Sequence, residues 1–195
     1  MNKKVVCKKT LLFMSLLFCC CIGTKAQGGI VKTNLFTDIV GTLSIGGEYQ
    51  LSAKTSASLM LSYNAWTKSD DNKKMNYFLI QPEYRKWLRG VYNGYFVGVQ
   101  ANYGQYNVGG MYPWYIASMK KLDNSRFQGD LIGVGISNGY QWVLSPRFNL
   151  ELSASVGFLH CIYNKYYLGG FTPISKSTHN HWGLTQLGLT LVYYI

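Results

Sequence analysis

The segment "FNLELSASVGF", residues 148–158, alternates without interruption between apolar residues and polar residues or glycine. Side chains of a β-strand point alternately to its two faces, so this segment predicts a strand with one apolar and one polar face. It is about twice as long as a typical strand of a soluble protein. A tilted strand of about 9–11 residues can cross a bilayer, so the length favours an apolar face that contacts lipid.

Seven other segments alternate in the same way. The eight predicted strands are residues 30–37, 42–52, 55–66, 76–88, 94–107, 127–143, 147–164 and 182–195. No segment has a helical period, apart from a short turn expected within residues 114–122. The tight connections "SAKT", "RGVYNG" and "LSPR" would lie at one end of the sheet, and longer ones at 67–75, 108–126 and 165–181 at the other. This organisation predicts an all-β fold, an eight-stranded antiparallel up-and-down transmembrane β-barrel.

Residues 1–26 have the features of a secretory signal peptide. Four lysines precede an apolar stretch at residues 11–22, and Thr24 and Ala26 supply the small residues that precede a cleavage site. Lipoprotein processing at one of the cysteines 19–21 is the alternative. The sequence thus predicts export through the Sec pathway to the outer membrane of a Gram-negative bacterium, with residues 27–195 forming one barrel domain.

Composition excludes several functions once the leader is set aside. Of the 19 Lys and Arg residues, five lie in residues 1–26, which leaves 14 against eight acidic residues. These cations are scattered, so nucleic acid is not an expected partner. Four of the five cysteines also lie in the leader, so Cys161 has no cysteine to pair with in the rest of the chain.

If the apolar faces contact lipid, the polar faces fill the interior. This places five charged residues inside the barrel: Lys32, Glu48, Glu83, Arg85 and Glu151. Buried carboxylates require charged partners, so we expect a structural network of ion pairs that ties strands together. An ion or proton path is the alternative, although the interior of an eight-stranded barrel is only wide enough to be filled by side chains.

Other candidate sites offer incomplete chemistry. His160 and Cys161 are adjacent on a strand and therefore point to opposite faces, which argues against a thiol nucleophile with its base. His179 and His181 in "STHNH" are half of a metal site and have no neighbouring acid for a hydrolase triad. We therefore expect no enzyme activity, no cofactor and no metal.

One predicted loop carries an aromatic cluster, in "GGMYPWYIASMKK". Tyr112, Trp114 and Tyr115 followed by two lysines are a candidate extracellular contact surface for a protein or glycan. The alternative is that these rings cover the mouth of the barrel or lie at the level of the lipid headgroups.

Four stretches resemble a known family: "KTNLF" at 32–36, "NYFLIQPEYRKWL" at 76–88, "GQYNVGG" at 104–110 and "RFQGDLIGVGISNGYQWVLSPRFNLE" at 126–151. The chain resembles Bacteroidota-type exported proteins of the domain-of-unknown-function family 3575. The resemblance implies a small outer-membrane barrel similar to the transmembrane domain of OmpA. It also implies a possible partner in a surface or fimbrial assembly protein, and it supplies no catalytic residues.

The sequence therefore predicts an outer-membrane barrel with a side-chain-filled lumen and a structural or surface-interaction role, as an accessory to cell-surface or fimbrial assembly. Outer-membrane lipid is the expected surrounding, and the oligomeric state is left open. A lipid-modifying barrel enzyme and a narrow ion or solute channel are the alternatives.

Overall fold

The computed structural model describes residues 29–68, 73–109, 125–167 and 172–195. The expected signal peptide lies outside the described residues. Within the described ranges, eight strands follow one another along the chain. They are β1 (Gly29–Asn34), β2 (Leu43–Ser52), β3 (Thr55–Lys68), β4 (Lys73–Trp87), β5 (Gly94–Gly109), β6 (Ser125–Val143), β7 (Phe148–Tyr167) and β8 (Pro173–Tyr194).

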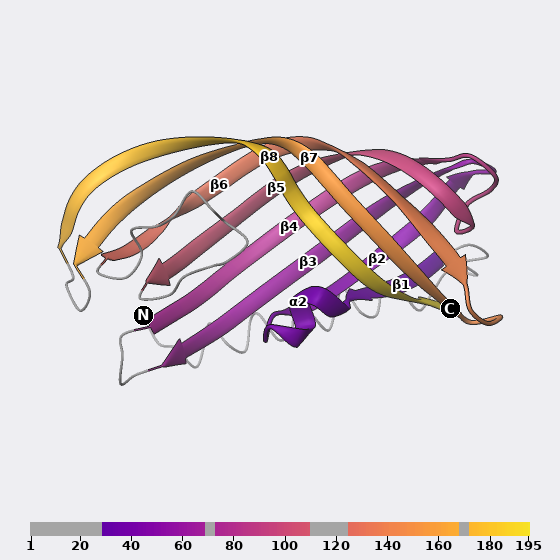
Figure 1. Cartoon of the computed structure of the whole chain (residues 1–195), viewed down its shortest axis with the longest axis horizontal. Helices are drawn as coiled ribbons and strands as arrows, with labels where there is room; N and C mark the ends of the chain where they lie inside the picture. The colour runs from indigo at the N-terminus through magenta and orange to yellow at the C-terminus, as the bar shows by residue number, and fades with distance from the viewer. Residues whose placement is uncertain (1–28, 69–72, 110–124, 168–171) are drawn as a thin grey trace, which may run out of the picture.

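The strands form one closed antiparallel ring in which each strand pairs with the next along the chain. The ring closes where β1 pairs with β8, from Ile30 opposite Tyr194 to Asn34 opposite Thr190. Strand length rises from 6 residues in β1 to 22 in β8. In Figure 1, β8 runs from the far left of the view to the C-terminus beside β1. The prediction of eight sequential antiparallel strands is confirmed.

The first connection differs from the prediction. Strand β1 ends at Asn34, where residues to 37 were expected to be extended, and the five-residue helix α2 (Leu35–Ile39) follows. Asn34 caps this helix, since its side-chain Oδ1 accepts a hydrogen bond from the Phe36 N–H at 3.2 Å. Asp38 then accepts hydrogen bonds from the backbone N–H and the hydroxyl of Ser44, at 3.0 and 2.7 Å, and so fixes the start of β2.

All three expected long connections are shorter than the sequence suggested, and two of them differ substantially. Strands β3 and β4 continue to Lys68 and from Lys73, and β8 begins at Pro173, inside the loop expected at 165–181. The prediction of an exterior loop over 165–181 is therefore wrong in large part. Residues 173–181 are polar on both faces apart from Pro173 and Ile174, so they lack the alternation that indicates a strand, but their backbone pairs with β7 up to Tyr166 opposite Pro173.

The inside of the ring is polar and its outside is apolar. In β7, Glu151 is 1% exposed and its neighbour Leu152 is 43% exposed. Other exposed apolar side chains on neighbouring strands include Val134, Ile136 and Val156. The expected inward residues that prove buried are Lys32, Asn34, Glu48, Ser58, Asn64, Gln81, Arg85, Gln100, Asn102, Ser137, Gln141, Glu151, Ser153, Ser155 and Thr190.

Candidate functional site

All five charged residues expected inside the ring meet there. They come from strands that lie far apart in the sequence: Lys32 from β1, Glu48 from β2, Glu83 and Arg85 from β4, and Glu151 from β7. Each of these residues lies on the inward face of its strand. Glu83 and Arg85 share that face because they are two residues apart. The network therefore connects opposite walls of the ring.

Arg85 is the centre of this network. Its guanidinium contacts three carboxylates, with Nη1 3.0 Å from Glu48 Oε2, Nη2 2.7 Å from Glu83 Oε2, and Nη1 2.7 Å from Glu151 Oε2. A second contact, Nη2 to Glu151 Oε1 at 3.0 Å, makes the pair with Glu151 bidentate. Lys32 Nζ adds an ion pair to Glu48 Oε2 at 2.8 Å. Planar bidentate contacts of this kind are the strongest ion pairs that arginine makes.

Hydroxyl groups complete the carboxylate contacts. Ser56 Oγ donates to Glu48 Oε1 at 2.5 Å, and the Trp87 indole N–H donates to Ser56 Oγ at 2.8 Å. Ser137 Oγ donates to Glu83 Oε1. A Cβ at Gly98 would lie 2.5 Å from Ser137 Oγ and 2.8 Å from Glu83 Oε1, so only glycine leaves room for this contact.

The network holds two cations and three carboxylates, and every one of these carboxylates has an ion pair. Burying a charge is unfavourable unless it is paired, and a network that is satisfied in this way ties its strands to one arrangement. The hydroxyls of Ser56 and Ser137 are engaged as donors to carboxylates, so neither is placed as a nucleophile. The ion pairs of this arrangement hold distant strands together.

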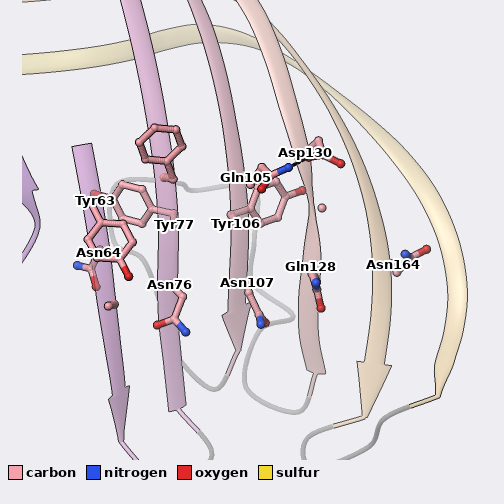
Figure 2. A pocket seen from close by; sticks show the side chains of 13 residues that line it. Tyr63, Asn64, Asn76, Tyr77, Gln105, Tyr106, Asn107, Gln128, Asp130 and Asn164 are labelled. Atoms are coloured by element: carbon pink, nitrogen blue, oxygen red, sulfur yellow. Dashed lines mark hydrogen bonds between the residues drawn. The ribbon is translucent and has the colours of Figure 1, made fainter. Parts of the chain in front are cut away.

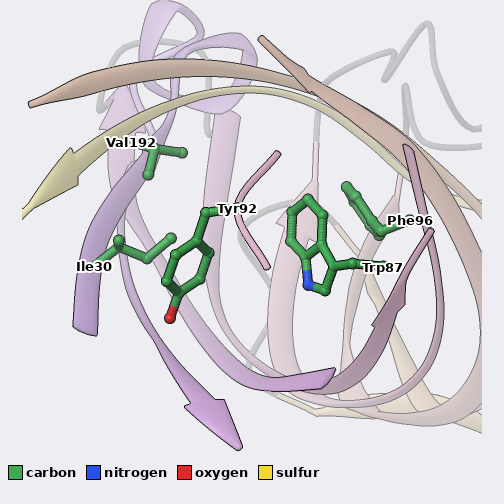
Figure 3. Close-up of a cluster of buried hydrophobic side chains, with 5 residues drawn as sticks. All are labelled: Ile30, Trp87, Tyr92, Phe96 and Val192. Carbon is green, nitrogen blue, oxygen red and sulfur yellow. The ribbon is translucent and has the colours of Figure 1, made fainter. Parts of the chain in front are cut away.

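An apolar cluster lies beside the network, toward the end with the short turns. It consists of Ile30, Trp87, Tyr92, Phe96 and Val192 (Figure 3). The rings of Trp87 and Phe96 have centroids 4.8 Å apart. The Arg85 guanidinium lies 4.2 Å above the Phe96 ring, a cation–π contact that joins the cluster to the ion pairs. These side chains point inward, whereas only polar residues and glycine were expected inside.

Tyr92 enters the cluster from the turn between β4 and β5. Its backbone has a φ of 67°, which is uncommon for a residue other than glycine. Its hydroxyl donates to the Glu48 carbonyl oxygen at 3.2 Å. Burial raises the pKa of Tyr92, so the phenol keeps the proton that it donates. The turn thus directs the aromatic side chain of Tyr92 into the interior that the strands enclose.

Amide side chains occupy the interior on the other side of the ion pairs. Gln81 Nε2 donates to Asn102 Oδ1 at 2.8 Å, and Ser155 Oγ donates to Gln100 Oε1 at 3.1 Å. Gln100 Nε2 in turn donates to the hydroxyl of Thr185 at 3.4 Å. Apolar, charged and amide layers therefore fill the interior in succession.

The remaining candidates do not assemble. Cys161 is buried on the inward face, and His160 points outward, where its Nδ1 lies 2.6 Å from Asn180 Oδ1. His179 and His181 lie on β8, and their expected position in a loop is wrong. Within the described ranges, no three His, Cys, Asp or Glu side chains are grouped as a metal site. Tyr112, Trp114 and Tyr115 lie outside the described residues.

These features define a class: a ring of eight antiparallel strands with a polar, side-chain-filled interior and an apolar outer surface. Residues 12–195 match the family described as "Protein of unknown function (DUF3575)", and the chain belongs to this family. Comparison with curated proteins and with solved structures found no match. Among the residues that the structure describes, no helix has the length and apolar character required to span a bilayer.

Proposed function

We propose that this chain is an outer-membrane β-barrel that is closed to flow and has a structural or surface-interaction role. The observation that carries the proposal is the inverted polarity of the ring. Charged and amide side chains are buried inside, and large apolar side chains are exposed outside. A soluble barrel of this size has the opposite distribution.

Exposed apolar residues continue from strand to strand around the outside. Ile45 on β2, Leu59 on β3, Val99 on β5, Ile136 on β6 and Leu184 on β8 all have more than two fifths of their surface exposed. A monomeric soluble protein rarely exposes a continuous apolar surface of this extent. A bilayer would cover it, and a closed ring satisfies the backbone hydrogen bonds that lipid cannot.

The filled interior supports a closed barrel over a channel. Trp87 and Phe96 are 1% and 0% exposed, and the Arg85 network spans the ring directly beside them. A narrow channel would require these contacts to open. The filled interior therefore supports a function at the surface, in contact with lipid or with a surface or fimbrial assembly protein at the end that carries α2.

Heat-dependent mobility tests the proposal. The protein, refolded into phospholipid vesicles, should migrate differently on a denaturing gel before and after boiling, and cell fractionation should recover it with the outer membrane. In planar bilayers the protein should give no steady conductance, and the Glu83→Gln variant should give none either. Recovery as a soluble periplasmic monomer would refute the membrane location, and stepwise conductance would favour the channel.

A further inference from the structure

Two rows of side chains cross the outward face of the sheet near the end that carries α2. Residues paired directly across strands form the first row: Tyr63, Phe78, Gln105 and Asp130. The second row lies two residues farther toward that end: Ala65, Asn76, Asn107, Gln128 and Asn164. Residues between the rows point inward, as Tyr77 does, whose hydroxyl lies 2.7 Å from that of buried Thr42.

The two rows form the walls of a groove with a volume of about 410 Å³. The backbone of the inward-pointing residues forms its floor, because they alternate with the residues of the two walls. Figure 2 shows Asn76, Asn107, Gln128 and Asn164 side by side on four neighbouring strands. The groove therefore crosses the strands and lies outside the filled interior.

The groove begins where the apolar outer surface ends. The next row toward the short turns is Leu61, Ile80, Tyr103 and Ile132, which are paired in the same register. Two rows later, the same four strands carry mainly amides. In a membrane-spanning barrel, such a change from apolar to polar side chains occurs at the level of the lipid headgroups.

The chemistry of the groove suits hydroxyl groups. A side-chain amide offers both two N–H donors and an oxygen acceptor, so a row of amides can pair with neighbouring hydroxyls in either role. Asn107 Oδ1 is buried and has no hydrogen-bond partner among the described residues. At the other wall, Gln105 Nε2 donates to Asp130 Oδ1 at 3.0 Å, which leaves the remaining carboxylate oxygen as an acceptor.

The charge and the aromatic residues of the groove restrict the class of ligand further. Among the described residues that line the groove, none is lysine or arginine and the single charged one is Asp130, so the lining itself offers no cation to a phosphate group. Tyr63 and Phe78 are 56% and 37% exposed and present apolar ring surface next to the amides. A few directional polar groups beside aromatic rings are typical of a small-molecule site, and here they fit an uncharged polyhydroxylated ring.

We propose that this groove binds the sugar headgroup of a glycolipid in the surrounding outer leaflet. The inference rests on the proposed membrane location, since a lipid-anchored sugar reaches the outward face directly above the apolar band. A glycan free in solution has the same hydroxyl chemistry but gains nothing from that position.

Binding to defined lipids tests the proposal. The protein, folded in zwitterionic detergent, would be titrated with a diacylglycerol that carries an uncharged hexose headgroup, with phosphatidylglycerol, and with the same hexose as a lipid-free methyl glycoside, and bound species counted by native mass spectrometry. The hexosyl diacylglycerol should bind most tightly. Asn107→Leu/Gln128→Leu should weaken it about tenfold or more, since two directional hydrogen-bonding groups are lost. Asn138→Leu, an exposed asparagine of β6 outside the groove, is the matched control and should change nothing.

Each other outcome would overturn the proposal. Unchanged binding in the double variant would exclude the groove, and equal binding of the free methyl hexoside would exclude a lipid-anchored source. If the double variant fails to show the mobility of folded protein, Gln128→Leu alone, at an exposed position, should still weaken binding about threefold. Wild-type protein that inserts into vesicles but does not distinguish the lipids would refute this inference and leave the proposed barrel intact.

Discussion

Replacing Arg85 with methionine tests the interior network, because this residue is its only link among three carboxylates. The substitution preserves much of the side-chain length and removes the charge. Glu48 keeps Lys32 and Ser56, and Glu83 keeps Ser137. Glu151 loses both of its contacts with Arg85, at 2.7 and 3.0 Å, and remains 1% exposed.

The size of the effect follows from that isolated carboxylate. Removing one partner of a buried ion pair destabilises a protein by about 3–5 kcal/mol, because the other charge stays buried without compensation. Arg85→Met should therefore lower the free energy of unfolding by at least about 3 kcal/mol. Glu151→Gln should cost less than half as much, since it removes the surplus carboxylate and leaves Arg85 paired with Glu48 and Glu83.

A double-mutant cycle separates the ion pair from general disruption. In Arg85→Met/Glu151→Gln, an amide replaces the unpaired charge, so the double variant should be more stable than Arg85→Met alone, with a coupling of about 1–3 kcal/mol. Urea unfolding in phospholipid vesicles, followed by the unboiled gel mobility, measures all four proteins. The reasoning fails if Arg85→Met lies within about 1 kcal/mol of wild type, or if the double variant is no more stable than the single one.

Three further predictions use the same assay or a close relative of it. Leu152→Arg, on the apolar outer face, should lower the free energy of unfolding by about 2–4 kcal/mol if residue 152 lies near the middle of a bilayer. Ser153→Ala, on the inner face, should change the free energy of unfolding by less than about 0.5 kcal/mol. The reverse order of the two effects would mean that the faces are assigned wrongly. Trp87→Ala should destabilise by about 3–5 kcal/mol, because it empties the centre of the apolar cluster, and an equally stable variant would contradict that role. The buried thiol of Cys161 should react with a water-soluble maleimide only after unfolding, and rapid labelling of the folded protein would show an open interior.

The sequence was sufficient to predict the strands that have one apolar and one polar face. In β6 and β7 the alternation predicted the two faces correctly, because a strand with one exposed apolar face and one buried polar face must keep a strict period of two. It also identified the five charged residues of the interior. It could not show that Arg85 is central, since this depends on how the register of the ring brings β2, β4 and β7 to one level.

Other features had weaker signals. The phase of apolar residues in β8 changes between Leu184 and Leu187, and this marks the register shift in which Ser155 faces Gln186 and Val156 faces Leu184. The extra residue at Thr185 could have been inferred from that change of phase. The turn of Tyr92 into the interior had no such signal, because a tight turn is ordinarily exposed and its ring depends on tertiary contacts with Trp87 and Glu48.

The lengths of the last strands fit the proposed membrane location. About 9–11 residues are enough to cross a bilayer, yet β8 has 22. Only Thr190–Tyr194 pairs with β1, so from Leu189 back to Pro173 one edge of β8 has no partner strand among the described residues. An open edge invites pairing with other chains, and proteins protect such edges with proline, charge and bulges. Pro173, Lys176 and the bulge at Thr185 supply all three, so under the proposed membrane location this projecting part of the sheet would lie in water and the closed part below it in lipid.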